Sequence, residues 1–327
     1  MPYTMGFDFG TASVRALVVD VKDGREMGGC TVAYSVITGA LPDGTMLKPD
    51  MVLADPAEYD EAMYAASRGA LEASGVAAEE IIGVGVDTTS CTMLALDENG
   101  RALCLQERFR HNPHAWMKLW KSRSAQKEAV RATEVARARD EEFLHWVGEN
   151  ISAEWLIPKA LETFHDAPEV FEAADRIMDL PDYMTMRLTG RYTTNIGTLC
   201  FKELGMHEQL PGEDYLREVE PGFEKLRDKM ATEKFVRWGD YAGPLTQEAA
   251  DKLGLKPGIA VAGGSLDGNV PIACLGIYKS GDMLLTLGTS GVLALMSSDG
   301  VNVKGLAGSN KDVFLPGFYG YEAGMAA

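Results

Sequence analysis

The sequence lacks the patterns that would assign it at once to several large classes of protein. It contains no Gly-x-x-x-x-Gly-Lys-Ser/Thr loop, which excludes a P-loop nucleotide-binding enzyme. No apolar run approaches the roughly 18 residues of a membrane span, and Asp8 comes before any apolar stretch as long as that of a signal peptide. We therefore expect a cytoplasmic protein without a membrane-spanning segment.

Cysteines and basic residues are both scarce. The five cysteines are odd in number and scattered, without the paired spacing of a metal site, so reduced thiols are the simplest interpretation. The 31 lysines and arginines are outnumbered by 48 aspartates and glutamates, which gives a formal net charge of −17. This charge repels nucleic acid and anionic membranes, and we expect neither as a partner. A phosphate ligand is still compatible, because backbone amides and a cation can bind it locally.

What the sequence does contain begins with MGFDFGTASVRALVVD, residues 5–20. Apolar residues alternate up to Phe9 and continue from Val14 to Val19, which predicts two strands. Only four residues join them, so we expect an antiparallel hairpin. Asp8 then lies at a sheet edge beside a turn of small residues whose N–H groups are free to bind an anion. An acid beside an anion site indicates a bridging cation, and the alternative is a solvated edge acid.

The rest of the chain alternates between strand and helix patterns. Asp55-Pro56-Ala57-Glu58 has the residues that open a helix, which we expect to end near Ser74-Gly75. The order of patterns fits an α/β or α+β domain with a mixed sheet. Further strands are expected within 24–36, 81–100 and 257–296, and mostly helix within 113–190.

Two segments that lie 278 residues apart repeat one pattern. FDFGTASVRALVVD at 7–20 and LTLGTSGVLALMSS at 285–298 share Gly-Thr, Val, Ala and Leu in register, each copy having a strand, a turn and a strand. The shared register favours a duplicated domain over a chance match of apolar strands. Two such turns facing each other could hold one polyphosphate between two lobes. The break at Gly243-Pro244 predicts domains at 1–244 and 245–327.

A second acid that could carry chemistry is Asp267, in GIAVAGGSLDGNV at 258–270. The pattern predicts a buried strand, a Gly-Gly turn and then an acid at a helix start, where N–H groups gather. Asp267 either caps this helix or acts as a base beside a phosphate. The nearby Gly288-Thr289 turn favours the base, because phosphoryl transfer needs one beside the γ-phosphate.

Three other motifs carry weaker signals. GVGVDT at 83–88 has only two glycines of a dinucleotide-binding fingerprint and continues into a strand, so a Rossmann cofactor site is not expected. His111 and His114 have a spacing compatible with a metal, but Pro113 lies between them and no third ligand is nearby, which favours structural roles. KLWKSRSAQK at 118–127 is interpreted as a solvated helix face, although the tryptophans of this region could pack over a small ligand.

Taken together, the motifs resemble the FGGY family of carbohydrate kinases, in order and over nearly the whole chain. The resemblance implies two actin-like, ribonuclease H-like domains with mixed sheets flanked by helices, and a cleft in which ATP and Mg²⁺ serve to phosphorylate a small-molecule sugar. The family continues well beyond GYEAG, so we expect an incomplete second domain whose exposed apolar strand edges favour a homodimer. The motifs are GFDFGTASVR, GVDTTSCT, HAWMKLWK, SAEWLIPKALE, GGSLDGN, LTLGTSG and GYEAG.

The resemblance also implies roles for residues at matching positions. Asp267 would be the general base for the terminal hydroxyl of the sugar, and Asp8 would help to hold Mg²⁺. The ATP phosphates would contact Gly10, Thr11, Ser13 and Arg15 in the first hairpin and Gly288, Thr289 and Ser290 in the second. The ketose would contact Asp267, Ser90, Lys202 and Glu322.

The ketose itself stays open at this point. The chain has Ser-Leu-Asp-Gly-Asn where kinases of ribulose commonly have Asn-Val-Asp-Ala-His. L-ribulose is the expected ketopentose, and D-ribulose and D-xylulose are alternatives. A non-catalytic sugar-binding or assembly protein on the same scaffold is the second hypothesis, and a chaperone-type or cytoskeletal ATPase is a weaker third.

Overall fold

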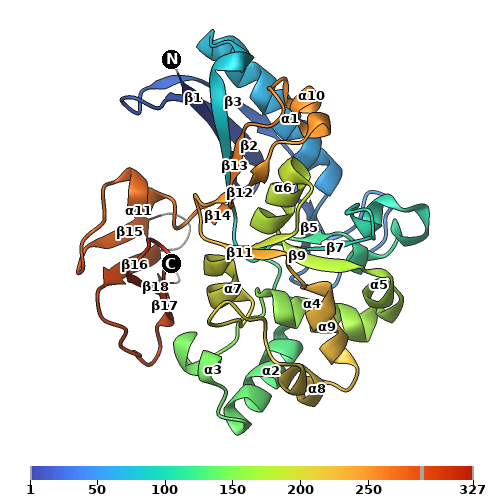
Figure 1. The fold of residues 1–327 in the computed structure, drawn as a ribbon. Coiled ribbons are helices and arrows are strands. Elements are labelled where there is room, and N and C mark those ends of the chain that lie inside the picture. The colour runs from blue at the N-terminus through green and yellow to red at the C-terminus, as the bar shows by residue number, and fades with distance from the viewer. Residues whose placement is uncertain (1, 288–290, 326–327) are drawn as a thin grey trace.

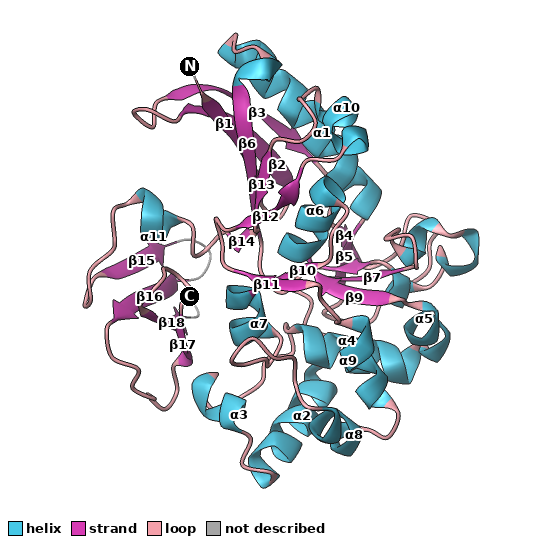
Figure 2. Cartoon of the chain, in the orientation of Figure 1, coloured by secondary structure: helices cyan, strands magenta, loops and turns pink. Residues whose placement is uncertain are grey.

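The computed structural model describes residues 2–287 and 291–325. Figure 1 shows a sheet with its helices at the top, a helix-rich region at the lower right and a small separate sheet at the left. Figure 2 shows strands and helices mixed along the chain, with helices flanking the upper sheet. Both views fit the predicted α/β class.

The first sheet is mixed, with strand order β12–β13–β6–β1–β2–β3 and β14 paired beside β6. β1 and β2 form the predicted antiparallel hairpin, and β1 pairs in parallel with β6. The strands are β1 (Tyr3–Phe9), β2 (Ser13–Asp20), β3 (Glu26–Ala33), β6 (Ile81–Thr88), β12 (Tyr241–Pro244), β13 (Ala260–Ala262) and β14 (Ser265–Leu266).

Side chains alternate between the two faces of β1, and this alternation decides on which face Asp8 lies. Met5, Phe7 and Phe9 are buried in the core, so Asp8 lies on the opposite face of β1. The core side is covered by α1 (Pro56–Ser74), which packs closely on β3. A Cβ at Gly28 would lie only 2.5 Å from the Ser74 nitrogen, so the close packing of helix and strand requires glycine there.

Helix α1 begins and ends where the sequence predicts. The Asp55 carboxylate accepts a hydrogen bond of 2.9 Å from the Ala57 amide, and Pro56 occupies the first turn. Gly75 ends the helix in the left-handed conformation, with φ of 64°. The prediction is confirmed at both ends because each signal is local.

A second sheet of order β4–β5–β8–β7–β9 and a pair β10–β11 lie among the helices of the middle region. Their strands are β4 (Ile37–Thr38), β5 (Val52–Ala54), β7 (Met93–Leu96), β8 (Met117–Lys118), β9 (Arg176–Asp179), β10 (Thr193–Asn195) and β11 (Lys234–Val236). The helices are α2 (Gln126–Ala138), α3 (Glu142–Trp146), α4 (Leu156–Asp166), α5 (Pro168–Ala173), α6 (Leu180–Thr189), α7 (Ile196–Lys202), α8 (Glu213–Val219) and α9 (Leu226–Lys229). The helix α10 (Gln247–Leu253) instead lies beside α1 at the first sheet, as Figure 1 shows.

The interpretation of KLWKSRSAQK as a solvated helix face is wrong. Lys118 lies in β8 and is fully buried, and the following helix begins only at Gln126. The Lys118 ammonium donates to Glu162 Oε2 at 2.7 Å and to Thr163 Oγ1 at 2.9 Å on α4. Its charge is therefore compensated inside the protein by residues more than forty positions away, which no local pattern reveals.

His111 and His114 have separate partners, as the structural interpretation expects. His111 contacts Asp43 at the surface. The His114 ring is buried, with Nδ1 3.1 Å from the Lys118 ammonium. Burial, and then the nearby Lys118, lower the pKa of His114 to about 3, so the ring is neutral at ordinary pH.

The third part of the chain is a sheet of order β15–β16–β18–β17, preceded by α11. It shares a small core with α7, in which Phe201 stacks on Phe314 at a centroid distance of 5.5 Å. The elements are α11 (Pro271–Cys274), β15 (Met283–Leu287), β16 (Gly291–Ser297), β17 (Ala307–Lys311) and β18 (Tyr319–Met325).

The structure differs from the predicted domain boundary between residues 244 and 245. β12 ends at Pro244, but β13 and β14 follow it in the chain and still pair within the first sheet. The Gly243-Pro244 break ends an edge strand without ending the domain. The first sheet therefore extends to Leu266, and the chain leaves it only after that residue.

The predicted repeat forms two antiparallel hairpins, but their pairing differs by one residue. Phe9 pairs with Val14 in the first hairpin, whereas Leu287 pairs with Gly291 in the second. Under the sequence alignment, Val292 and not Gly291 corresponds to Val14, so the second hairpin closes one residue earlier. Across the described residues, no helix is long and apolar enough to span a membrane.

Candidate active site

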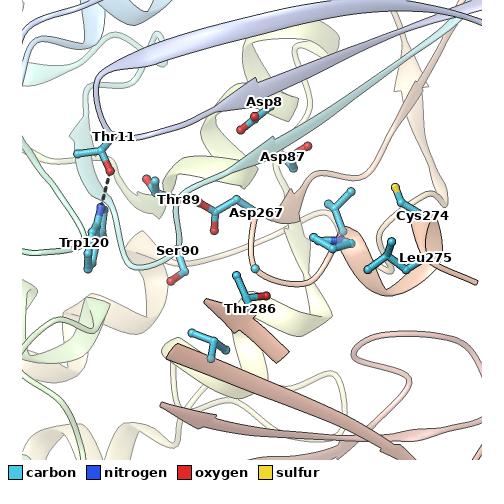
Figure 3. A pocket seen from close by; sticks show the side chains of 14 residues that line it. Asp8, Thr11, Asp87, Thr89, Ser90, Trp120, Asp267, Cys274, Leu275 and Thr286 are labelled. Carbon is cyan, nitrogen blue, oxygen red and sulfur yellow. Dashed lines mark hydrogen bonds between the residues drawn. The ribbon is translucent and has the colours of Figure 1, made fainter. Parts of the chain in front are cut away.

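A cavity of about 680 Å³ lies between the first sheet and the segment that follows Asp267. Residues at the ends of β1 and β6 form one wall, and residues of α11, β15 and β16 form the other. Figure 3 shows the carboxyl groups of Asp8, Asp87 and Asp267 near one another, with Thr11 and Trp120 farther along the cavity. Of the predicted site residues, the cavity wall contains Asp8, Thr11, Ser90 and Asp267.

Asp8 and Asp87 are neighbours on adjacent strands. The parallel register of β1 and β6 sets Asp8 beside Asp87, and the hairpin register sets Asp8 opposite Arg15. Arg15 Nη1 is 3.8 Å from Asp8 Oδ2. Burial, followed by the charges of Asp8 and Asp267, raises the pKa of Asp87 to about 8. The strands thus hold two acids together at a site that favours a cation.

These two acids fit a magnesium ion that is bound together with phosphate. Mg²⁺ in phosphoryl-transfer sites usually takes one or two carboxylates and completes its shell with water and substrate phosphates. Asp8 and Asp87 can supply those carboxylates. Among the described side chains, no group of three or more His, Cys, Asp or Glu is arranged to hold a metal ion. The site is therefore suited to a metal that binds with a nucleotide and less to a permanently bound one.

Asp267 comes directly after β14, whose residues pair with the end of β6. Its amide donates to the Thr88 carbonyl at 2.8 Å, which fixes the residue against the first sheet. Asp267 is exposed to the open cavity, but the surrounding protein atoms desolvate its carboxyl group and raise the pKa to about 6. Asp8 and Glu322 contribute less, and the Gly268 amide opposes the shift. The carboxyl group is thus a better proton acceptor than an exposed aspartate.

The alternative role of Asp267 as a helix cap is not supported. The helix that follows, α11, begins at Pro271, and Val270 is in the capping position. The expectation that Asp267 stands at a helix start is therefore wrong by several residues. Its position is set by the sheet, through β14, and it borders the cavity.

The first hairpin turn is held from two sides. The Tyr34 hydroxyl lies 2.5 Å from the Gly10 carbonyl and 2.9 Å from the Ser13 carbonyl, and the Tyr34 amide donates to the Ala12 carbonyl. On the cavity side, Trp120 Nε1 donates to Thr11 Oγ1 at 3.0 Å, as Figure 3 shows. These bonds restrain the turn at the edge of the cavity.

The turn differs in one respect from the prediction that its amides are free. The Gly10 amide donates to the Ser13 carbonyl at 3.0 Å. In the described part of the chain, the Thr11 and Ala12 amides have no acceptor. An anion can therefore be bound by these two amides, with Arg15 nearby on β2 and largely exposed.

The predicted sugar-binding residues converge on Asp267 from three elements. Lys202 Nζ at the end of α7 is 2.9 Å from Glu322 Oε1 on β18, and both side chains are mostly buried. Burial lowers the pKa of Lys202, but Glu322, together with smaller contributions from Cys91 and Glu154, outweighs this and keeps the pKa above its usual range. Lys202 and Glu322 both influence the pKa of Asp267, and Ser90 lines the same cavity as Asp267. Lys202 is therefore not a surface lysine, because it is buried.

The second predicted phosphate turn, Asp87 and Trp120 remain to be placed relative to the site. Gly288, Thr289 and Ser290 lie outside the described residues. The sequence analysis missed Asp87, although it ends a strand in the same way as Asp8 and this shared position could have indicated it. Trp120 lines the cavity, and the expectation that a tryptophan of this region packs over a small ligand stays a prediction.

Comparisons with known proteins agree on the family. Residues 3–274 match the model for the FGGY family of carbohydrate kinases, N-terminal domain. The chain is 37 % identical over 330 residues to the ribulokinase of Geobacillus thermodenitrificans and 36 % identical over 328 residues to that of Mycolicibacterium smegmatis. Each match covers 99 % of the chain and 58 % of the relative. The chain thus spans somewhat more than half the length of these relatives.

Solved structures show the same fold. The xylulose kinase from Rhodospirillum rubrum matches with a TM-score of 0.79 and 22 % identity, over 99 % of the chain and 61 % of that protein. The Plasmodium falciparum glycerol kinase with ADP matches with a TM-score of 0.77 and 14 % identity, over 100 % and 61 %. The predicted actin-like fold class is confirmed. The chain belongs to the FGGY family of carbohydrate kinases.

Proposed function

We propose that the protein is an ATP-dependent kinase that transfers the γ-phosphoryl group to the terminal hydroxyl of a ketopentose, converting L-ribulose to L-ribulose 5-phosphate in the cytoplasm. The observation that carries the proposal is the place of Asp267. This carboxyl group borders the cavity that Asp8 and Asp87 also line, and the charges of Lys202 and Glu322 act on it from the other side chains of the site. Such a position suits a base between a phosphate donor and a sugar.

In this proposal the acids of the first sheet serve the nucleotide. Asp8 and Asp87 would hold Mg²⁺, which when bound neutralises phosphate charge and orients the triphosphate. The amides of Thr11 and Ala12 and the Arg15 guanidinium would bind phosphate oxygens, as would Gly288, Thr289 and Ser290 of the second hairpin. Gly10 and Ser13 would shape the first turn through the bond between them.

Asp267 and its neighbours serve the sugar. The terminal hydroxyl oxygen attacks the γ-phosphorus, the bond from that phosphorus to the bridging oxygen breaks, and ADP leaves. The hydroxyl proton passes to the Asp267 carboxylate, which is mostly ionised at neutral pH because its pKa is about 6. The Lys202 ammonium would donate hydrogen bonds to sugar hydroxyls, Glu322 would accept one, and Ser90 can do either.

The similarity to proteins named ribulokinase supports L-ribulose as the substrate, with D-ribulose and D-xylulose as the alternatives. The division into a sugar-binding N-terminal domain and the start of a second domain is part of the same proposal, with the boundary moved beyond Leu266 as the sheet requires.

A coupled assay of ADP formation with L-ribulose, D-ribulose, D-xylulose and glycerol tests the proposal. We expect ADP formation that depends on the sugar and is fastest with L-ribulose. Equal ADP formation with and without sugar would contradict it and favour an ATPase. Sugar binding without turnover at any ATP concentration would favour the non-catalytic hypothesis.

A further inference from the structure

The first turn of α4 carries a buried lysine that no role in the proposed reaction uses. Lys159 is buried in the protein, and only 1 % of its surface is exposed. Its ammonium donates to the Cys91 carbonyl at 2.6 Å and to the Leu119 carbonyl at 2.7 Å. No carboxylate of the described residues lies within 4.0 Å of it, so carbonyl dipoles alone compensate the charge directly.

The two carbonyls belong to segments that form the cavity wall. Cys91 follows Ser90 and has the left-handed conformation, with φ of 60°, so the chain turns sharply at this point. Leu119 precedes Trp120, whose indole is bonded to Thr11. Ser90 and Trp120 both line the cavity and are labelled on the left of Figure 3. The Lys159 ammonium therefore links two wall segments, at Cys91 and at Leu119, that are almost thirty residues apart in the chain.

The neighbouring buried lysine shows what a purely structural arrangement looks like. Lys118 is equally buried and also contacts α4, but it forms an ion pair with Glu162 and bonds to His114, Thr163 and the Lys159 carbonyl. It bonds to no residue that lines the cavity. A buried lysine paired in this way holds β8 on α4, whereas Lys159 is unpaired and bonds only to the backbone of the wall segments.

Retaining an unpaired ammonium in the interior is unfavourable unless the bonds it makes are needed. Burial lowers the pKa of Lys159 to about 8, with nearby Asp179 opposing the shift. Asp179 in turn accepts from the Thr92 amide at 2.9 Å, so the turn after Ser90 is held on both sides.

We infer that Lys159 is a positioning residue for the sugar: by donating to the Cys91 and Leu119 carbonyls, it fixes the separation of Ser90 and Trp120 and so the width of the sugar site. This inference rests on the proposed function, because it assigns the cavity to a ketose. It predicts that loss of the ammonium weakens sugar binding more than it weakens the fold.

The test compares two variants that each remove one buried lysine. In Lys159→Met the wall carbonyls lose their donor. The control, Lys118→Met/Glu162→Gln, removes the ion pair and the bond of Lys118 to the Lys159 carbonyl, but it keeps the Lys159 ammonium and both of its bonds to the wall carbonyls. Sugar affinity is measured by titration calorimetry with L-ribulose, and stability by thermal melting. A further variant, Lys159→Met/Asp179→Asn, avoids an unbalanced buried carboxylate and serves where the single change prevents folding.

We expect both Lys159 variants to bind L-ribulose at least about tenfold more weakly than the unaltered chain, the scale of losing hydrogen bonds from a charged donor. The control should stay within about twofold, at a melting temperature equal to or below that of the Lys159 variants. Amide exchange at 89–92 and 119–121 should rise in the Lys159 variants only. If the Lys159 variants and the control have equal affinities for L-ribulose, the inference about Lys159 is overturned and the proposed function is not. Absence of L-ribulose binding by the unaltered chain would overturn the proposed function together with it.

Discussion

Asp267 is the single residue on which the proposed chemistry depends most. Its carboxyl group faces the cavity, and its amide is fixed to the Thr88 carbonyl at the end of β6. A base with a pKa near 6 is ionised at neutral pH and still accepts a proton well, which suits transfer from an attacking hydroxyl. The sequence predicts Asp267 from its motif, but only the structure shows why its pKa is raised.

Replacing this carboxylate tests its role directly. Asp267→Asn keeps the size and hydrogen-bonding capacity of the side chain but removes the proton acceptor. We expect turnover to fall by a factor of about 10² or more, with sugar affinity nearly unchanged. Steady-state kinetics and sugar titration measure the two quantities. Asp23→Asn, at an exposed turn, is the control. Unchanged turnover in Asp267→Asn would remove the proposed base.

A second prediction at the residue scale concerns Asp87 and pH. The pKa of Asp87 is raised to about 8 in the fold, while an aspartate in an unfolded chain titrates near 4. Between these values the folded protein binds one proton more than the unfolded chain, so this group lowers the free energy of unfolding as pH rises from about 4 to about 8. The asparagine of Asp87→Asn has no proton to lose, so this contribution to the fall in the free energy of unfolding is absent from the variant.

We therefore expect Asp87→Asn to be more stable than the unaltered chain at pH 8 without Mg²⁺, by about 1–2 kcal/mol once partial exposure is allowed for. The difference should vanish near pH 4. Urea unfolding at the two pH values measures it. If the variant and the unaltered chain have equal free energies of unfolding at both pH values, Asp87 carries no unfavourable charge.

At the scale of elements, the first hairpin turn is a unit with two supports. The Tyr34 hydroxyl contacts two turn carbonyls from one side, and Trp120 contacts Thr11 from the other. Tyr34 also stacks on Tyr59 at a centroid distance of 3.8 Å, which keeps its ring in place. The turn is thus preorganised for the phosphates that we propose it binds.

Removing one support should loosen the turn without unfolding the sheet. Tyr34→Phe deletes only the hydroxyl, and we expect the affinity for Mg-ATP to fall about three- to tenfold, the scale of one or two hydrogen bonds. Tyr59→Phe is the matched control, because the Tyr59 hydroxyl makes no bond to the turn. Nucleotide titration compares them. Equal affinities in the two variants would show that Tyr34 does not shape the site.

The elements also show which parts of the fold the sequence can predict. The hairpin at residues 3–20 and helix α1 were predictable because their signals lie within a few residues. Lys118 was misinterpreted because its partner Glu162 is distant in the chain. Asp87 was missed because only the register of β1 against β6 sets it beside Asp8. The boundary at residue 244 was misplaced because β13, which continues the sheet, comes later in the chain.

At the scale of the whole molecule, the edge strand β15 presents an exposed apolar face. Met283, Leu285 and Leu287 alternate along this edge strand and are 54 %, 46 % and 77 % exposed. Apolar residues on an exposed edge strand favour pairing with another chain. The homodimer expected from the sequence remains a prediction, and this strand is where it is best tested.

We expect the chain to self-associate in the micromolar range and the variant Leu285→Lys/Leu287→Lys to be monomeric at the same concentration. Sedimentation velocity measures both. Val301→Lys introduces a charge at another exposed apolar residue and should leave association unchanged. A monomeric unaltered chain at every concentration would count against this role of β15.

The account as a whole predicts where a sugar lies relative to Asp267. The most direct measurement is a crystal structure of the chain with L-ribulose bound. We predict the terminal hydroxyl within hydrogen-bond reach of the Asp267 carboxylate, about 2.6–3.2 Å, with the other hydroxyls toward Lys202 and Glu322. A sugar bound with its terminal hydroxyl turned away from Asp267, or bound outside this cavity, would contradict the central claim.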